Sequence, residues 1–152
     1  MTDTLFRRMV VPTDFSAPAE EAWALAQRLA RAVGAEIVLT HVFVPAPVYG
    51  VPPEAAGTEM QVFIEAQDWV EKELERWATA ARATGLTVRT ALRTGTAHQE
   101  IVDLAAAERA ELVVIGTHGR TGLTRALLGS VAERVLRLAP CPVLSVRKPE
   151  PE

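Results

Sequence analysis

Short apolar runs alternate with longer stretches of helical periodicity along the 152-residue chain, and this alternation limits the possible folds more than any other feature. The apolar runs predict strands at 6–11, 37–44, 86–93, 112–115 and 143–146. Helical spacing of apolar residues fills the segments between them, so the order is β-α-β-α-β-α-β-α-β, at about 30 residues per unit. This order predicts an α/β fold, a Rossmann-like open sandwich with a mainly parallel sheet and helices on both faces.

The chain length predicts a single domain over residues 1–152 with one core. Ser16 is expected to cap the first helix, with Pro18 in its first turn and Gly34 just past its end. The later helices are each expected to begin at a capping box, namely Thr58–Gln61, Thr96–Gln99 and Ser130–Glu133.

Composition and charge exclude several classes of protein. Hydrophobic residues make up 49% and charged residues 23%, as in an ordinary globular domain, and the net charge of −3 without a basic block predicts no nucleic-acid partner. No apolar run is long enough to span a membrane, and no apolar segment follows Arg7 and Arg8 as in a secretory signal, so we expect a cytoplasmic protein. The single cysteine, Cys141, and the spacing of the three histidines predict neither a metal site nor a catalytic nucleophile.

Two loops at the carboxyl ends of expected strands are the best candidates for a binding site. In open α/β sheets, ligands bind beyond these ends, at the point where the strand order reverses. The loops are 12–16, after the first strand, and 116–130, after the fourth. If these strands are neighbours, both loops frame the same crevice.

The second loop is rich in glycine and ends at an expected helix start, Gly129-Ser130. Backbone N–H groups and the helix dipole favour an anion there, and His118, Arg120 and Arg125 add donors or positive charge. The alternative is a plain turn and helix cap. P-loop, dinucleotide-binding and hydrolase-elbow motifs are absent.

Several other residues have two interpretations. Asp14 could contact a ribose, a base or a metal carried by phosphates, or it could form an Asx turn or helix cap. His41 is more typical of a satisfied core histidine than of a ligand, and the three tryptophans are more typical of core or interface. The proline-rich segment 45–53 is expected to be a mobile, lid-like loop.

The glycine spacing resembles a known family signature. Gly116-x2-Gly119-x9-Gly129-Ser130 matches, at every fixed position, the ATP-binding motif of the universal stress protein family. Further segments resemble the family's strands and last helix, and the similarity is weakest over 45–95. These segments are 11–16, 40–42, 130–135 and 139–143.

The resemblance implies a five-stranded sheet of order 3-2-1-4-5, ATP as the ligand, and Mg²⁺ or Mn²⁺ held mainly by its phosphates. Asp14 and Val42 would contact the nucleoside, whereas the glycines and Ser130 would hold ribose and phosphates. Ala97 replaces a proline common in the family, a departure expected to touch a helix start rather than the pocket. The nucleotide-binding residues that follow are Pro12, Thr13, Asp14, Val42, Gly116, Gly119, Arg120, Gly129, Ser130 and Val131.

The function predicted in this way is an ATP-binding stress-response or regulatory module with little or no turnover, at most weak ATP hydrolysis, and regulatory protein partners that the sequence does not name. One alternative is a slow metal-dependent ATPase or phosphotransferase, and another is a protein-interaction module that binds no nucleotide. A homodimer is expected through 143–146, an uncharged strand at a sheet edge, since Arg89 and Arg93 guard the opposite edge.

Overall fold

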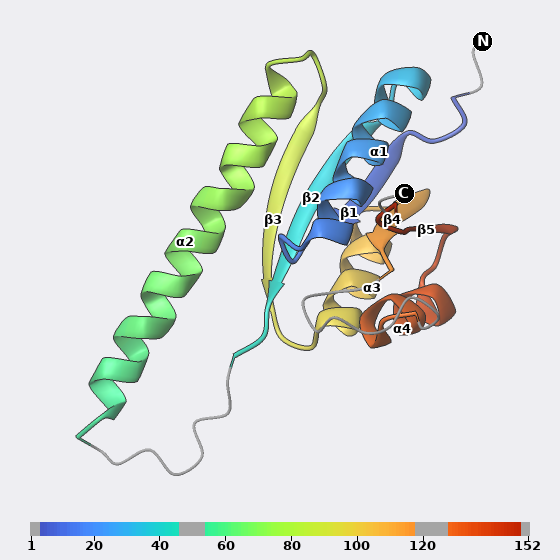
Figure 1. Cartoon of the computed structure of the whole chain (residues 1–152). Helices are drawn as coiled ribbons and strands as arrows, with labels where there is room; N and C mark the ends of the chain where they lie inside the picture. The colour runs from blue at the N-terminus through green and yellow to red at the C-terminus, as the bar shows by residue number, and fades with distance from the viewer. Residues whose placement is uncertain (1–3, 46–53, 118–127, 150–152) are drawn as a thin grey trace.

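The structure, a computed structural model, describes residues 4–45, 54–117 and 128–149 (Figure 1). The strands pair in parallel in the order β3-β2-β1-β4-β5, which confirms the predicted fold class and sheet order. The elements are β1 (Arg8–Pro12), α1 (Ala17–Val33), β2 (Glu36–Phe43), α2 (Ala56–Arg82), β3 (Val88–Thr94), α3 (Ala97–Ala107), β4 (Leu112–Gly116), α4 (Ser130–Leu138) and β5 (Val143–Val146).

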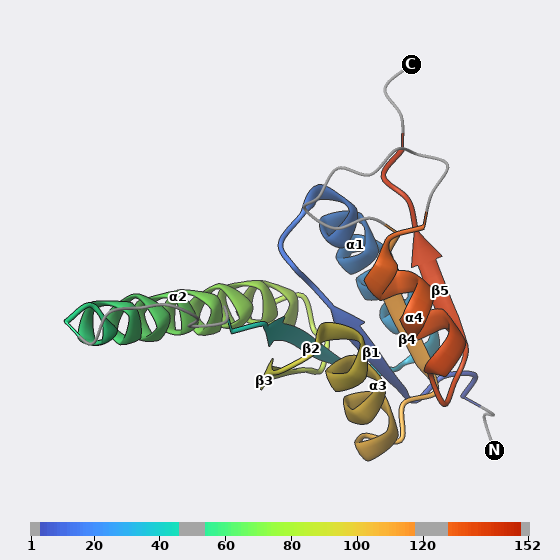
Figure 2. The same cartoon turned by 90° about the horizontal axis from the view of Figure 1, so that it is seen from below.

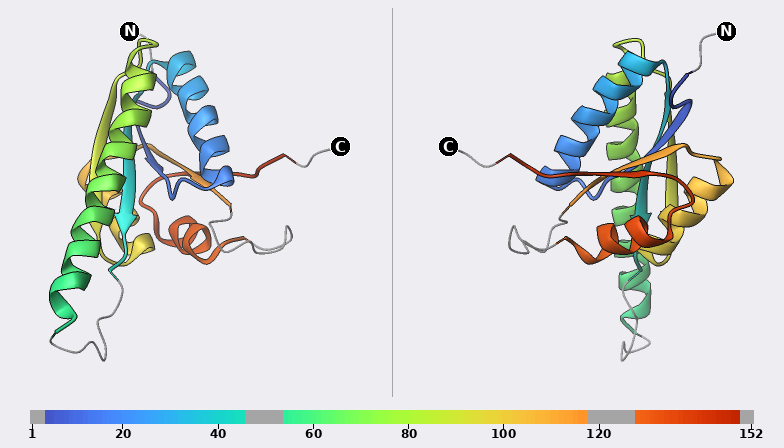
Figure 3. Two further views of the ribbon diagram at one scale, coloured as in Figure 1. Left: turned by 60° about the vertical axis from the view of Figure 1, so that its left-hand side comes forward. Right: turned by 90° about the vertical axis from the view of Figure 1, so that its right-hand side faces the viewer.

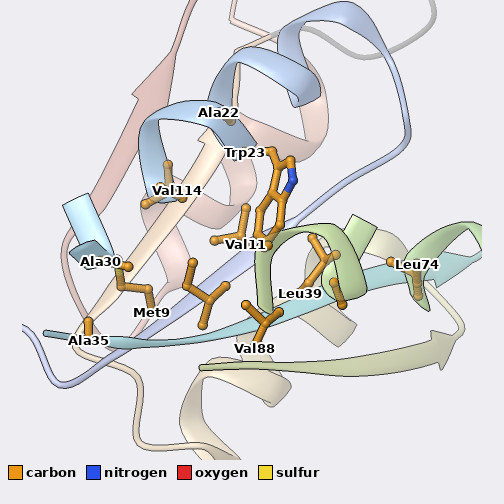
Figure 4. Packing of buried hydrophobic residues seen from close by; sticks show 14 of the residues in the cluster. Met9, Val11, Ala22, Trp23, Ala30, Ala35, Leu39, Leu74, Val88 and Val114 are labelled. Carbon is orange, nitrogen blue, oxygen red and sulfur yellow. The ribbon is translucent and has the colours of Figure 1, made fainter. Parts of the chain in front are cut away.

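Helices cover both faces of the sheet, as the alternating pattern predicts (Figure 2). Met9 and Val11 of β1 point into a core shared with α1 and α2, where Trp23 and Leu74 lie (Figure 4). Val10, between them, belongs to the core formed with α3 and α4. This alternation along one strand explains why β1 is apolar on both faces.

The first helix begins and ends as predicted. The Ser16 hydroxyl accepts the Ala19 N–H at 3.4 Å, and Gly34 has the left-handed φ of 75° that favours glycine after a helix. Strand ends differ from the prediction by at most two residues, as at Arg8 and Val88, where β1 and β3 begin.

The three capping boxes, in contrast, do not form as predicted. Helix α2 begins at Ala56, before Thr58, because Glu59 N–H already bonds the Ala55 carbonyl at 3.1 Å. Thr96 occupies the cap of α3 without a side-chain hydrogen bond. Gly129 is the cap of α4, and Ser130 is its first helical residue. Backbone hydrogen bonds thus define these helix starts without the predicted hydroxyl contacts.

Most of the predicted lid, 45–53, lies outside the described residues, so the structure does not test it. Within the described ranges, none of the helices combines the length and apolar character that crossing a membrane requires.

Four charged side chains form an ion-pair cluster at the amino end of the sheet. Arg8 contacts Glu36 on the neighbouring strand and donates to the Glu108 carbonyl at 2.6 Å. Arg89 lies 2.6 Å from the Glu108 carboxylate and 3.6 Å from that of Glu36. The hydrogen bond from Arg89 holds the pKa of Glu108 below its ordinary value of 4.5. The cluster joins three strands to the end of α3.

Glu108→Gln is therefore expected to destabilise the protein at neutral pH by about 1 kcal/mol or less, as for other exposed ion pairs. Because the pKa of Glu108 is lowered in the folded state, its stabilising effect is present above its unfolded value and is lost as the pH falls below it. Urea unfolding at pH 7 and at pH 3.5 measures this difference. Glu71→Gln, on the exposed side of α2, is the control, and an equal cost at both pH values would contradict the prediction.

Candidate functional site

A cleft of about 350 Å³ opens at the carboxyl ends of β1 and β4, between the two halves of the sheet. From β1 the strand order runs through β2 and β3 to one edge of the sheet, and from β4 it runs through β5 to the other edge. The strand order therefore reverses between β1 and β4, and ligands bind at this point in open α/β sheets. Every sequence-predicted site residue that the structure describes lines this cleft, as do others. Those predicted residues are Pro12, Thr13, Asp14, Val42, Gly116, Gly129, Ser130 and Val131.

Gly119 and Arg120, the remaining predicted residues, lie outside the described residues, together with His118 and Arg125. The structure therefore brings the two ends of the glycine-rich loop together and leaves its middle undescribed.

The loop after β1 is held by its own backbone and short side chains. Thr13 is buried, and its N–H donates to the Thr40 carbonyl at 2.8 Å. Its hydroxyl accepts the Phe15 N–H at 2.9 Å. The Asp14 carboxylate accepts the Ser16 N–H at 3.0 Å, which is the Asx turn that the sequence left open. Asp14 also lines the cleft, so the turn positions this carboxylate at the site.

Phe15 belongs to this loop and anchors it through ring contacts. Its backbone has a left-handed φ of 62°, uncommon for a non-glycine residue. Its ring stacks on His41 at 5.3 Å and meets the edges of Trp77 at 5.3 Å and Trp69 at 5.6 Å. His41 Nδ1 lies 2.8 Å from the Thr13 carbonyl oxygen, to which a protonated nitrogen donates. His41 is thus a hydrogen-bonded histidine that also forms part of the cleft wall.

The two ends of the glycine-rich loop, at Thr117 and Gly129, lie side by side. Thr117 is buried; its N–H donates to the Val146 carbonyl at 2.9 Å, and its own carbonyl accepts the Gly129 N–H at 2.6 Å. The start of α4 is thereby fixed beside the end of β4. The first N–H groups of any helix lack partners within that helix, and here they belong to residues that line the cleft. The arrangement can bind an anion.

Gly116 has a structural reason to be glycine. A Cβ at this position would lie 2.9 Å from the carbonyl carbon and oxygen of Pro18, in the first turn of α1. The absence of a side chain lets β4 end against the start of α1, independently of any ligand.

Three further apolar residues that the sequence did not indicate line the same cleft. Ala97, Ile101 and Ile115 line the cleft beside Val42. Ile101 and Ile115 have the spacing of ordinary core residues, and only tertiary packing brings them together in one cluster beside the cleft. The expectation that the alanine at position 97 affects a helix start but not the pocket is wrong. Ala97 is the first residue of α3 and also lines the cleft.

No group of three or more histidine, cysteine, aspartate or glutamate side chains within 4–45, 54–117 and 128–149 is arranged to hold a metal ion. Cys141 is partly buried, and burial raises the pKa of its thiol, so it remains protonated at neutral pH.

Comparison with known proteins identifies the family of this chain. The model of the universal stress protein family matches residues 5–147. The chain belongs to the universal stress protein family. Universal stress protein MJ0531 of Methanocaldococcus jannaschii is 37% identical over 155 residues, which cover 99% of this chain and 87% of that relative.

Solved structures of this family share the fold. Protein MJ0577, a universal stress protein of the same organism, superposes with a TM-score of 0.83 at 26% identity and covers 97% of this chain and 99% of its own. A universal stress protein in complex with cAMP has a TM-score of 0.62 at 27% identity, covering 93% and 96%. The protein from Archaeoglobus fulgidus in complex with dAMP has a TM-score of 0.59 at 25% identity, covering 93% and 98%.

Proposed function

We propose that this universal stress protein binds ATP and acts as a nucleotide-dependent stress-response or regulatory module with little or no turnover. One observation carries the proposal: a single cleft collects the Asp14 loop, the end of β2 at Val42 and the start of α4 at Ser130. Its apolar wall suits a flat base, and a helix start suits phosphate groups. The relatives crystallised with cAMP and dAMP hold adenine nucleotides, which supports the same ligand class here.

In this proposal the nucleoside lies between Asp14 and Val42, and Pro12 and Thr13 form the floor beneath it. Gly116, Gly129, Ser130 and Val131 contact the ribose and phosphates, and Gly119 and Arg120 complete the site from the loop. Mg²⁺ or Mn²⁺ would arrive on the phosphates, because Mg²⁺ usually keeps several waters and binds through substrate phosphates with few protein ligands. Mass spectrometry of small molecules released from freshly purified protein tests whether the cleft carries a nucleotide.

ATP is expected to bind at least about tenfold more tightly than GTP, a difference of about 1.4 kcal/mol. The reason is that the resemblance and the two nucleotide complexes all concern adenine, whereas guanine has a carbonyl oxygen in place of the adenine amino group and an amino group at C2. Titration calorimetry with both nucleotides measures the difference. Equal affinities would leave a nucleotide site but contradict the adenine assignment.

We also propose that the protein forms a homodimer through β5. This strand lies at the sheet edge, carries no charged side chain, and leaves Val143, Leu144 and Val146 only half-buried. The carbonyl of Pro142 accepts the N–H of Val113 in β4 at 3.0 Å, and the carbonyl of Val146 accepts the N–H of Thr117, just after β4, at 2.9 Å. Alternate residues therefore direct their backbone groups away from the sheet, and antiparallel pairing with a second copy would satisfy them.

Ser145→Pro is accordingly expected to weaken dimerisation by at least about tenfold, because it removes an outward N–H from the edge strand. Ser145→Ala keeps this N–H and is the matched control, which should dimerise like the wild type. Sedimentation velocity across a range of concentrations gives the dimer dissociation constants. A wild-type monomer at micromolar concentration would overturn the dimer proposal and leave nucleotide binding unaffected.

A further inference from the structure

The first half of α2 projects beyond the end of the sheet (Figures 1 and 3). The α2 residues that reach the core, Val70, Leu74, Ala78 and Ala81, all lie in its second half. Residues 57–69, here called the arm, contain no fully buried side chain. At 1.5 Å per residue the arm is about 20 Å long, enough for a partner segment of about four turns.

The arm exposes an unusual amount of apolar surface. Met60, Val62, Ile64 and Trp69 are 59%, 60%, 51% and 53% exposed. Met60 and Ile64 are one turn apart on one side, and Val62 and Trp69 are two turns apart on the other. Between these rows lies Phe63, whose ring meets Phe43 at 4.9 Å. The protein uses Phe63 and Trp69 of this apolar surface for its own ring contacts, and Met60, Val62 and Ile64 are more than half exposed.

The charge of the same segment is equally uneven. The arm contains three acidic side chains, Glu59, Glu65 and Asp68, and no basic one, so its net charge of −3 equals that of the whole chain, and Lys72 is the first basic residue after it. Lys72 is itself paired with Asp68 at 2.8 Å. Beyond the arm, Glu73 and Glu75 are paired with Arg76 and Arg82 and so do not add to this charge.

An exposed apolar face with one sign of charge around it indicates a partner of the opposite sign. Two arms of this kind would repel each other, so a second copy docked arm to arm is disfavoured. We propose that the arm is a docking site for an amphipathic, lysine- or arginine-rich helical segment of another protein. The partner's apolar stripe packs along the row formed by Met60 and Ile64, and its basic side chains face the carboxylates.

This docking does not require the nucleotide site, because none of the residues that line the cleft belongs to the arm. The proposal thus extends the proposed function by a partner class and can fail separately from it.

The test uses a fluorescein-labelled 18-residue peptide with leucine at heptad a and d positions and lysine elsewhere, titrated with the full-length protein by fluorescence anisotropy. Binding should weaken at least tenfold between 50 and 300 mM NaCl, because salt screens the charges. Met60→Ser with Ile64→Ser should weaken binding at least tenfold. Glu59→Lys with Glu65→Lys should have an effect of the same size. Circular dichroism confirms that each variant is folded.

Matched controls lie elsewhere on the surface. Leu136→Ser with Leu138→Ser removes two leucines of α4 that are 51% and 53% exposed, and should leave peptide affinity within twofold. Asp103→Lys with Glu111→Lys repeats the charge change away from the arm, with the same expectation. Ser130→Glu, in the cleft, should also bind the peptide normally, which separates this proposal from nucleotide binding.

Three results would overturn the proposal. The first is absence of peptide binding, or equal affinity in the wild type and both arm variants. The second is equal binding of a scrambled peptide of identical composition, since that would show charge attraction without the apolar contact. The third is a wild-type dimer that Met60→Ser with Ile64→Ser dissociates, because a second copy would then occupy the arm.

Discussion

Ser130→Glu is expected to lower the affinity for ATP by about 100-fold or more while the fold survives, because a carboxylate at a helix start takes the place of an anion. Ser130 is the first residue of α4 and is exposed on the cleft wall. The new carboxylate can accept hydrogen bonds from the first N–H groups of α4, and it repels the phosphates of a nucleotide. An acidic residue in the first turn is otherwise favourable for a helix, so stability should not fall.

Titration calorimetry with ATP measures this loss, and Thr79→Glu on the exposed side of α2 introduces the same charge as a control. Gly129→Val is a second variant, since Gly129 is buried on the cleft wall and donates to the Thr117 carbonyl at 2.6 Å. A β-branched side chain there blocks close approach of a ligand to the backbone, and thermal unfolding checks that the fold remains. Unchanged affinity for ATP in Ser130→Glu would remove the start of α4 from the site.

The position of the cleft was predictable because few residues determine it. The apolar run of β4 ends at Gly116, and the Asp14 loop follows the equally apolar β1, so both loops lie at carboxyl ends of buried strands. Once these two strands are neighbours, the loops must meet. The glycine spacing that resembles the family signature added the ligand class, which periodicity alone does not give.

The apolar wall and the support of the Asp14 loop were not predictable in the same way. Ile101 belongs to an ordinary helical pattern, and only tertiary packing decides that it also faces a cleft. The left-handed backbone of Phe15 has no sequence signature, since glycine or asparagine normally adopts it. Its ring contacts join the loop after β1 to His41 of β2 and Trp77 of α2, three segments that are far apart in the sequence.

Helix α2 gives a further example. Its apolar spacing, from Phe63 to Ala81, predicts one long amphipathic helix, and the structure has that helix. Spacing does not reveal where the sheet beneath it ends. Only the fold shows that the apolar face from Met60 to Trp69 remains exposed instead of joining the core.

Gly116→Ala is expected to lower the free energy of unfolding by about 1–3 kcal/mol, the range typical of overpacking a closely packed site. The added Cβ would lie 2.9 Å from the carbonyl carbon and oxygen of Pro18 and 3.0 Å from the Ala19 nitrogen. These are backbone atoms in the first turn of α1, so no side-chain rotation relieves the contact and the backbone itself must shift. Urea unfolding monitored by circular dichroism measures the change.

Gly57→Ala is the matched control, because a Cβ at Gly57 would have nothing within 4 Å. This glycine is the second residue of α2, at its exposed end, so the free energy of unfolding should change by less than about 0.5 kcal/mol. The pair separates two reasons for glycine in the signature. A destabilised Gly116→Ala that still binds ATP when folded would show that this glycine serves the contact between β4 and α1, whereas an unchanged stability with lost binding would assign it to the ligand.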